Sequence, residues 1–263
     1  MKIFLRTLTV LAALTSFIST AADLTNAIEI ITKANLASYY TADDGSADAR
    51  MIIVDSKGNK QMRQFTILRK DQRDLGNQDM LVFFSRPTDV SGTVFRVIKK
   101  VQSDDDRWLY LPALDLVKRI SAGDKRTSFV GAHFFYEDVS GRNPEEDSFT
   151  LTQTDEQLYT LKAVPKDPTS VEFSYYIVNI DKNTFLPMQV DYYNQQGEKT
   201  RTMQVLKTQV IEGFTTVTHS KITQHFDGSY TELQFRNVKY NLGLPDSIFS
   251  ERSLRNPPKE WLK

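Results

Sequence analysis

The feature that most constrains this chain is an alternation of apolar and polar residues that runs from Asp48 to Asn237 and is interrupted only between about residues 124 and 141. A period of two residues is typical of β-strands with one buried face, and turn sequences such as DSKGN at residues 55–59 separate the apolar runs. The predicted strands span residues 51–54, 64–68, 80–85, 93–101, 107–111, 116–120, 149–152, 158–164, 171–181, 187–193, 199–210, 214–225 and 229–237. We therefore expect about 11–13 antiparallel strands in one large sheet, which must curve at that size.

Helical periodicity is confined to the two ends of this meander. Residues 24–34 place apolar side chains at the three-and-four spacing of one helix face, and Asp23 or Thr25 can cap that helix. Near the C-terminus, Pro245 and Asp246 begin a short predicted helix that Pro257 ends. The pattern predicts an α+β fold in which helices cover one face, the concave one, of a large curved antiparallel sheet.

The first residues predict an export signal rather than part of the fold. Lys2 and Arg6 give a positive start, residues 8–18 are apolar, and small residues follow at positions 19–21. We expect a signal peptide over residues 1–21 and a single domain over residues 22–263, because no repeat or Pro-rich linker divides the remainder. The sequence contains no cysteine, which excludes a lipid-bearing cysteine and disulfides. These features predict a freely diffusing periplasmic protein.

The sequence carries no motif of catalysis or nucleic-acid binding. It has no nucleophile elbow, P-loop, dinucleotide fingerprint or paired-histidine zinc motif, and its formal net charge of +0 gives no electrostatic footprint for nucleic acid. His133 with Glu137 and Asp138 forms one local cluster of metal-ligating residue types, for which a hydrogen-bonded loop histidine is the simpler interpretation. We therefore expect no enzymatic activity, no metal and no cofactor.

The stretch from Asp104 to Gly141 is dense in large apolar residues. Its first part predicts strands, whereas its second part is polar, then aromatic, then acidic, which predicts a structured loop with a helical turn across the sheet. Aromatic residues on this loop and on consecutive strands fit either a solid core or the wall of an apolar cavity, and the residues alone leave both interpretations open. The candidate ligand-binding residues are Phe83, Phe95, Trp108, Tyr110, Phe129, Phe134, Phe135 and Tyr136.

Several motifs occur in a distinctive order along the chain. They are SGT at 91–93, RWLYLPAL at 107–114, KRI at 118–120, SFVGA at 128–132, FYED at 135–138 and a terminal PD at 245–246 followed by Phe249 and Arg252. In order and spacing these motifs resemble the LolA-like outer-membrane lipoprotein-sorting proteins, in the larger branch associated with transporters of the resistance-nodulation-division (RND) type. The resemblance implies a half-open β-barrel whose concave face binds acyl chains under a lid of helices.

Because of this resemblance, the favoured hypothesis is a periplasmic carrier. Such a carrier would bind the acyl chains of a lipid or lipoprotein and shuttle that lipid or lipoprotein between the inner and outer membranes. The implied partners are an inner-membrane RND-family transporter and, transiently, the membranes themselves, with the protein acting as a monomer. An alternative is an RseB-like envelope sensor that binds lipoprotein or lipid and regulates a partner protein. A third hypothesis, an enzyme acting on lipid or glycan, needs a catalytic pair, for which His133 is the best candidate.

Overall fold

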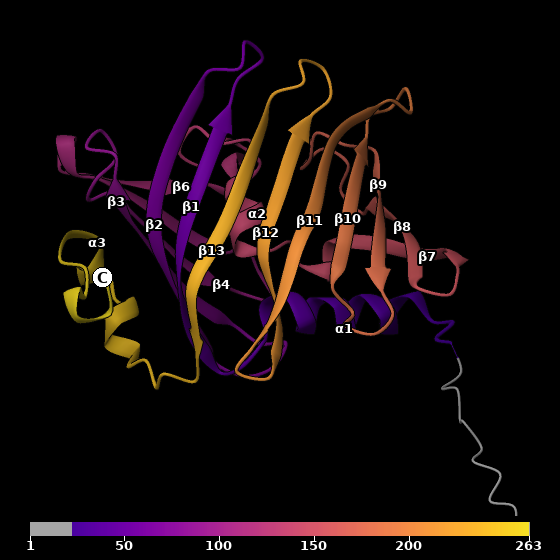
Figure 1. The fold of residues 1–263 in the computed structure, drawn as a ribbon, viewed down its shortest axis with the longest axis horizontal. Coiled ribbons are helices and arrows are strands. Elements are labelled where there is room, and N and C mark those ends of the chain that lie inside the picture. The colour runs from indigo at the N-terminus through magenta and orange to yellow at the C-terminus, as the bar shows by residue number, and fades with distance from the viewer. Residues whose placement is uncertain (1–22, 263) are drawn as a thin grey trace, which may run out of the picture.

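The computed structural model describes residues 23–262 and contains one antiparallel sheet of thirteen strands (Figure 1). The strands are β1 (Asp44–Val54), β2 (Lys60–Asp71), β3 (Gln78–Arg86), β4 (Val94–Lys99), β5 (Asp106–Leu111), β6 (Leu116–Ile120), β7 (Asp147–Thr154), β8 (Leu158–Pro165), β9 (Tyr175–Asp181), β10 (Pro187–Tyr193), β11 (Lys199–Ile211), β12 (Phe214–Gln224) and β13 (Tyr230–Tyr240). The helices are α1 (Ala27–Tyr39), α2 (Tyr136–Ser140) and α3 (Arg252–Arg255). The expected signal peptide, residues 1–21, lies outside the described residues.

Every predicted strand overlaps one observed strand, so the period-two prediction is confirmed. The largest shift is at β1, which begins at Asp44 rather than Met51. The core-facing residues in the first half of β1 are Gly45, Ala47 and Ala49. Such small residues give a weak apolar signal, so the start of the strand is hard to recognise in the sequence.

The order of the strands makes the sheet a ring that is broken at one place. The order is β6-β5-β4-β3-β2-β1-β13-β12-β11-β10-β9-β8-β7, and the ends of the meander meet where β1 pairs with β13. The two free edges, β6 and β7, are consecutive in sequence. The sheet is therefore a half-open barrel, and residues 121–146, here called the crossing segment, connect its two edges.

Helix α1 lies across the β8–β10 part of the concave face (Figure 1). The side chain of Asn26, rather than Asp23 or Thr25, caps this helix by accepting hydrogen bonds from the N–H groups of Ile28 and Glu29. Ile30 and Ala34 are buried against the strands. None of the helices among residues 23–262 is long and apolar enough to cross a membrane.

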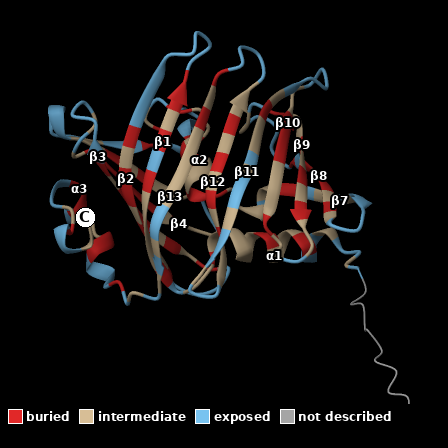
Figure 2. Cartoon of the chain, in the orientation of Figure 1, coloured by how far each residue is buried: buried red, intermediate tan, exposed pale blue. Residues whose placement is uncertain are grey.

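The C-terminal segment covers the other face of the sheet, so the expectation that both terminal helices cover one face is wrong. Leu244, Ile248, Phe249 and Leu254 pack on apolar residues of β2–β4, including Leu68. The neighbouring strand residues Ile67 and Phe65 belong instead to the concave cluster. Figure 2 shows buried residues both in the strands and in this segment. Strands β3 and β4 are apolar on both faces and therefore need a layer on each side.

The outer layer predicts a measurable contribution to folding. Leu254 is fully buried, so Leu254→Ala is expected to lower the free energy of unfolding by about 2–5 kcal/mol through lost burial and the cavity left behind. Leu114→Ala is the matched control, because Leu114 is 70% exposed and should change stability by less than about 0.5 kcal/mol. Urea unfolding followed by circular dichroism measures both, and equal midpoints would show that the outer layer does not stabilise the sheet.

Candidate ligand cavity

Two elements fill most of the concave face, one on each arm of the half-barrel. The crossing segment packs on strands β1–β5, and α1 packs on β8–β10. Phe129 of the crossing segment is 1% exposed, and its ring centroid lies 5.3 Å from that of Phe95, 5.6 Å from that of Phe84 and 5.6 Å from that of Tyr136. This arm is a solid aromatic core.

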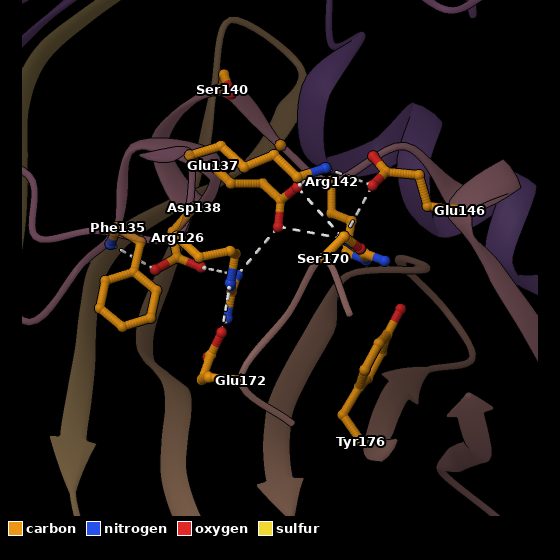
Figure 3. Close-up of polar contacts among 12 residues, drawn as sticks. Arg126, Phe135, Glu137, Asp138, Ser140, Arg142, Glu146, Ser170, Glu172 and Tyr176 are labelled. Carbon is orange, nitrogen blue, oxygen red and sulfur yellow. Dashed lines mark hydrogen bonds and ion pairs between the residues drawn. The ribbon is translucent and has the colours of Figure 1, made fainter. Parts of the chain in front are cut away.

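A buried carboxylate holds the crossing segment in place (Figure 3). The Glu137 side chain at the start of α2 is 1% exposed and contacts three cations of the same segment. Its oxygens lie 2.9 Å from Lys125 Nζ, 3.1 Å from Arg126 Nη1 and 3.3 Å from Arg142 Nη1. Removing the Glu137 carboxylate would take away the buried counter-ion that these three cations share.

The same cations reach out from the crossing segment to the opposite arm. Arg142 forms a two-pronged ion pair with Asp147 at the start of β7, with distances of 2.8 and 2.9 Å. Arg126 forms another with Glu172 in the loop before β9, at 2.6 and 2.9 Å. Figure 3 shows Arg126 between the carboxylates of Glu137, Asp138 and Glu172. The crossing segment therefore packs on one arm through aromatic rings and binds the other through charge.

Arg201 on β11 completes this ion cluster. Its guanidinium forms an ion pair with Asp138 and donates to the carbonyl oxygen of His133 at 3.1 Å. The guanidinium carbon also lies 3.9 Å from the ring centroid of Phe135, a geometry typical of a cation–π contact. Phe135, at the start of α2, is thus part of the charged cluster rather than of the aromatic core.

The surrounding cations decide the charge of Glu137. Burial alone would raise its pKa, but Arg126, Arg142 and Lys125 outweigh burial and hold the pKa at about 2, against an ordinary value of 4.5. Glu137 is therefore ionised at neutral pH, and its ionised form stabilises the fold.

An apolar pocket remains between the C-terminal end of α1 and strands β10–β13. Its volume is about 240 Å³. The lining residues are Ala37, Ser38, Tyr39, Thr41, Arg69, Leu186, Pro187, Met203, Val205, Thr215, Thr216, Val217, Ser220, Phe235 and Tyr240. The one charged side chain in this lining, Arg69, donates from Nη2 to the carbonyl oxygen of Thr41 at 2.6 Å and lies 3.5 Å from Asp71. The rest of the wall suits an apolar ligand.

A second pocket of about 160 Å³ adjoins the first. The two share the lining residues Arg69, Thr216, Val217, Phe235 and Tyr240. The second pocket extends from these residues toward β1 and β2, where Gly45, Ala47 and Ile67 line it. Together they form a candidate cavity for an elongated apolar group.

The structure separates the eight candidate residues predicted from the sequence into three groups. Phe95, Phe129, Phe134 and Tyr136 are buried in the aromatic core, and Phe135 lies in the ion cluster. Phe83, Trp108 and Tyr110 face the outer layer instead. None of the eight lines the two pockets described above, and their role in ligand binding stays a prediction.

The residues of the possible metal cluster have other partners. The ring Nδ1 of His133 lies 2.8 Å from the hydroxyl of Thr231, and Glu137 and Asp138 face arginine and lysine. Within residues 23–262 no group of three or more metal-ligating side chains is gathered.

The sequence reasoning missed the pocket residues on β11–β13. Val205, Val217 and Phe235 look like ordinary apolar positions of strands, and nothing in their spacing distinguishes a pocket from a core. The cavity depends on the length over which neighbouring strands pair, and the sequence does not reveal that length.

The comparisons with known proteins agree with this architecture. A family model described only as an uncharacterized protein matches residues 76–256. The chain is similar to a solved DUF1329 family protein from Desulfovibrio piger, with 28% identity, a TM-score of 0.76 and coverage of 87% of this chain and 95% of that one. A search of the curated proteins gives no match.

Two further solved structures share this fold. One, from Vibrio parahaemolyticus, is described as an outer membrane lipoprotein-sorting protein domain, with 26% identity, a TM-score of 0.78 and coverage of 87% of this chain and 98% of that one. The other is a LolA superfamily protein from Nitrosomonas europaea, with 19% identity, a TM-score of 0.67 and coverage of 88% and 99%. The fold is therefore LolA-like.

The ion cluster predicts a specific dependence of stability on pH. A folded-state pKa of about 2 against 4.5 corresponds to about 3 kcal/mol of stability, present above pH 4.5 and lost as the pH falls toward 2. Glu137→Gln is therefore expected to lower the free energy of unfolding at pH 7 by about 3–5 kcal/mol, with the difference from the wild type narrowing below pH 4.5. Glu156→Gln, at an exposed site in the β7–β8 turn, is the control. Urea unfolding at pH 7 and pH 3 tests this, and a difference independent of pH would contradict it.

Proposed function

The chain belongs to the uncharacterized family whose model it matches, and we propose that it is a periplasmic carrier for an amphiphile with an acyl tail. The observation that carries the proposal is the apolar pocket left between α1 and strands β10–β13 on a concave face that is otherwise filled. A concave, mostly apolar pocket that opens to solvent is typical of a ligand site, which favours a binding role over a purely structural one.

The energetics fit the transport of a tail rather than a reaction on it. Each methylene removed from water contributes roughly 0.8 kcal/mol, so about a dozen carbons supply roughly 10 kcal/mol before the costs of ordering and opening are subtracted. The only charged group in the wall of the first pocket, Arg69, is already engaged by Thr41 and Asp71. The pocket thus supplies affinity for a chain without a pair of groups poised for catalysis.

We propose further that the cargo is a lipid or lipoprotein moved between the inner and outer membranes, and that an inner-membrane RND-family transporter is the partner. The name of one structural relative, an outer membrane lipoprotein-sorting protein domain, supports lipoprotein or lipid as the cargo class. The transporter is supported by the sequence resemblance of residues 107–114 and 128–138 described above. Release of a tightly held tail needs such a partner or a competing acceptor.

Filling the pocket tests the carrier function directly. Val205 and Val210 lie on the same strand, but Val205 lines the pocket whereas Val210 is 73% exposed. Val205→Trp is expected to weaken binding of a fluorescent fatty acid by about tenfold or more, because the indole occupies the space of at least two methylenes. Val210→Trp should bind as the wild type does. The measurement is a fluorescence titration of delipidated protein, with circular dichroism to confirm folding.

Native mass spectrometry of protein purified from membranes supplies the independent check. A wild-type protein that carries no lipid and takes up no fatty acid would contradict the carrier function. Equal binding by the two tryptophan variants would instead place the ligand outside this pocket.

A further inference from the structure

The ladder between β12 and β13 ends half-way along both strands. Their pairing runs from Thr223 opposite Tyr230 to His219 opposite Gln234 and forms no further pair among the described residues. Residues 214–218 of β12 remain paired with β11, and residues 235–240 of β13 remain paired with β1. Figure 1 shows the two strands diverging toward the bottom of the view. The sheet therefore has an opening between two strands that are adjacent in it.

Both pockets meet at this opening. Thr216 and Val217 line both from the β12 side, and Phe235 and Tyr240 line both from the β13 side. Successive residues of a strand point to opposite faces, so a pocket lined by Thr216 together with Val217 lies beside the strand rather than over one face. The cavity on the concave side thus extends into the gap between the strands.

A small set of side-chain contacts closes the gap. The hydroxyl of Tyr240 lies 2.8 Å from Oγ1 of Thr216, and the Tyr240 ring centroid lies 5.0 Å from that of Phe214. The backbone N–H of Tyr240 donates to the Glu212 carboxylate at 2.9 Å instead of to β12. A closure made of side chains opens by rotation about side-chain bonds, without disruption of a ladder of backbone hydrogen bonds.

The crossing segment offers a much less accessible route. Opening it would separate the ion pairs that Arg126 forms with Glu172 and Asp138 with the buried Arg201, and it would expose the aromatic core around Phe129. In addition, none of residues 121–146 lines either pocket, so its displacement would not uncover them.

We propose that the opening between residues 214–218 and 235–240 is the side entrance through which an acyl chain reaches the pocket, with Tyr240 as its latch. The proposal rests on the carrier function proposed above. It assigns the ligand route to a split within the sheet and leaves the crossing segment closed during uptake.

Two engineered cross-links separate the routes, because the chain has no cysteine of its own. His133→Cys with Thr231→Cys forms a disulfide between the crossing segment and β13, where the native side chains approach to 2.8 Å. Thr216→Cys with Tyr240→Cys, joined by a short bismaleimide, closes the opening. The readout is the rate of fluorescent fatty acid uptake by delipidated protein in a stopped-flow instrument, before and after linking.

The side entrance predicts that the disulfide leaves the uptake rate within about twofold of its reduced form, and that the bismaleimide slows uptake by about tenfold or more. The reverse pattern, with slow uptake only when the crossing segment is locked, would overturn it while leaving the carrier function intact. Absence of uptake by the wild type would contradict the carrier function itself, and the side entrance with it.

Removing the latch gives a second measurement that needs no cross-link. Tyr240→Phe keeps the ring against Phe214 but loses the hydrogen bond to Thr216. One net hydrogen bond contributes about 1 kcal/mol to keeping the opening closed, so its loss should accelerate uptake roughly fivefold. Tyr230→Phe is the control, because Tyr230 lies at the paired end of the same strand and should leave the rate unchanged. Unchanged uptake in Tyr240→Phe would show that Tyr240 is not the latch.

Discussion

The buried ion cluster around Glu137 lets the barrel of this protein stay open. A sheet of thirteen strands with free edges at β6 and β7 would expose two rows of unpaired backbone groups and could spread or close. The crossing segment ties those edges together by packing aromatic rings on one arm and forming ion pairs with the other. Because each cation of the segment faces more than one carboxylate, the segment has a single well-defined position.

The position of the cavity follows from that arrangement. The crossing segment packs mainly over β1–β5 and α1 over β8–β10, and the space left lies between the C-terminal end of α1 and strands β10–β13. At the β1 border of this space a glycine lets β1 and β13 approach closely, because an added Cβ at Gly45 would come within 2.8 Å of the backbone oxygen of Lys239. The C-terminal segment acts on the other face only and stabilises β2–β4 from outside.

The strands were predictable because each has its own alternation of apolar and polar residues. Which face of each strand lies on the concave side was not predictable. Phe83 and Phe84 are adjacent, yet Phe83 faces the outer layer and Phe84 the aromatic core. Since β3 and β4 are apolar on both faces, no alternation within the strand tells which face is concave. The helical turn of the crossing segment was predicted from its polar, aromatic and acidic parts, but its ion pairs were not. Arg126 and Glu172 meet across 46 residues, and only the folded topology brings them together.

The unpaired halves of β12 and β13 show why the cavity was the hardest feature to foresee. Both strands have the composition of fully paired strands, and both do pair, each with its other neighbour. The split arises because β13 bends with β1, where Asn237 has a positive φ of 51° and the register shifts between Ser46 and Asp48. Irregularities in both flanking ladders, β1–β13 and β11–β12, thus accompany the separation of the two strands, and the side chains of Thr216 and Tyr240 meet in the gap. An opening closed by side chains alone costs less to enlarge than the paired ladders and the helix that form most of the remaining wall of this cavity.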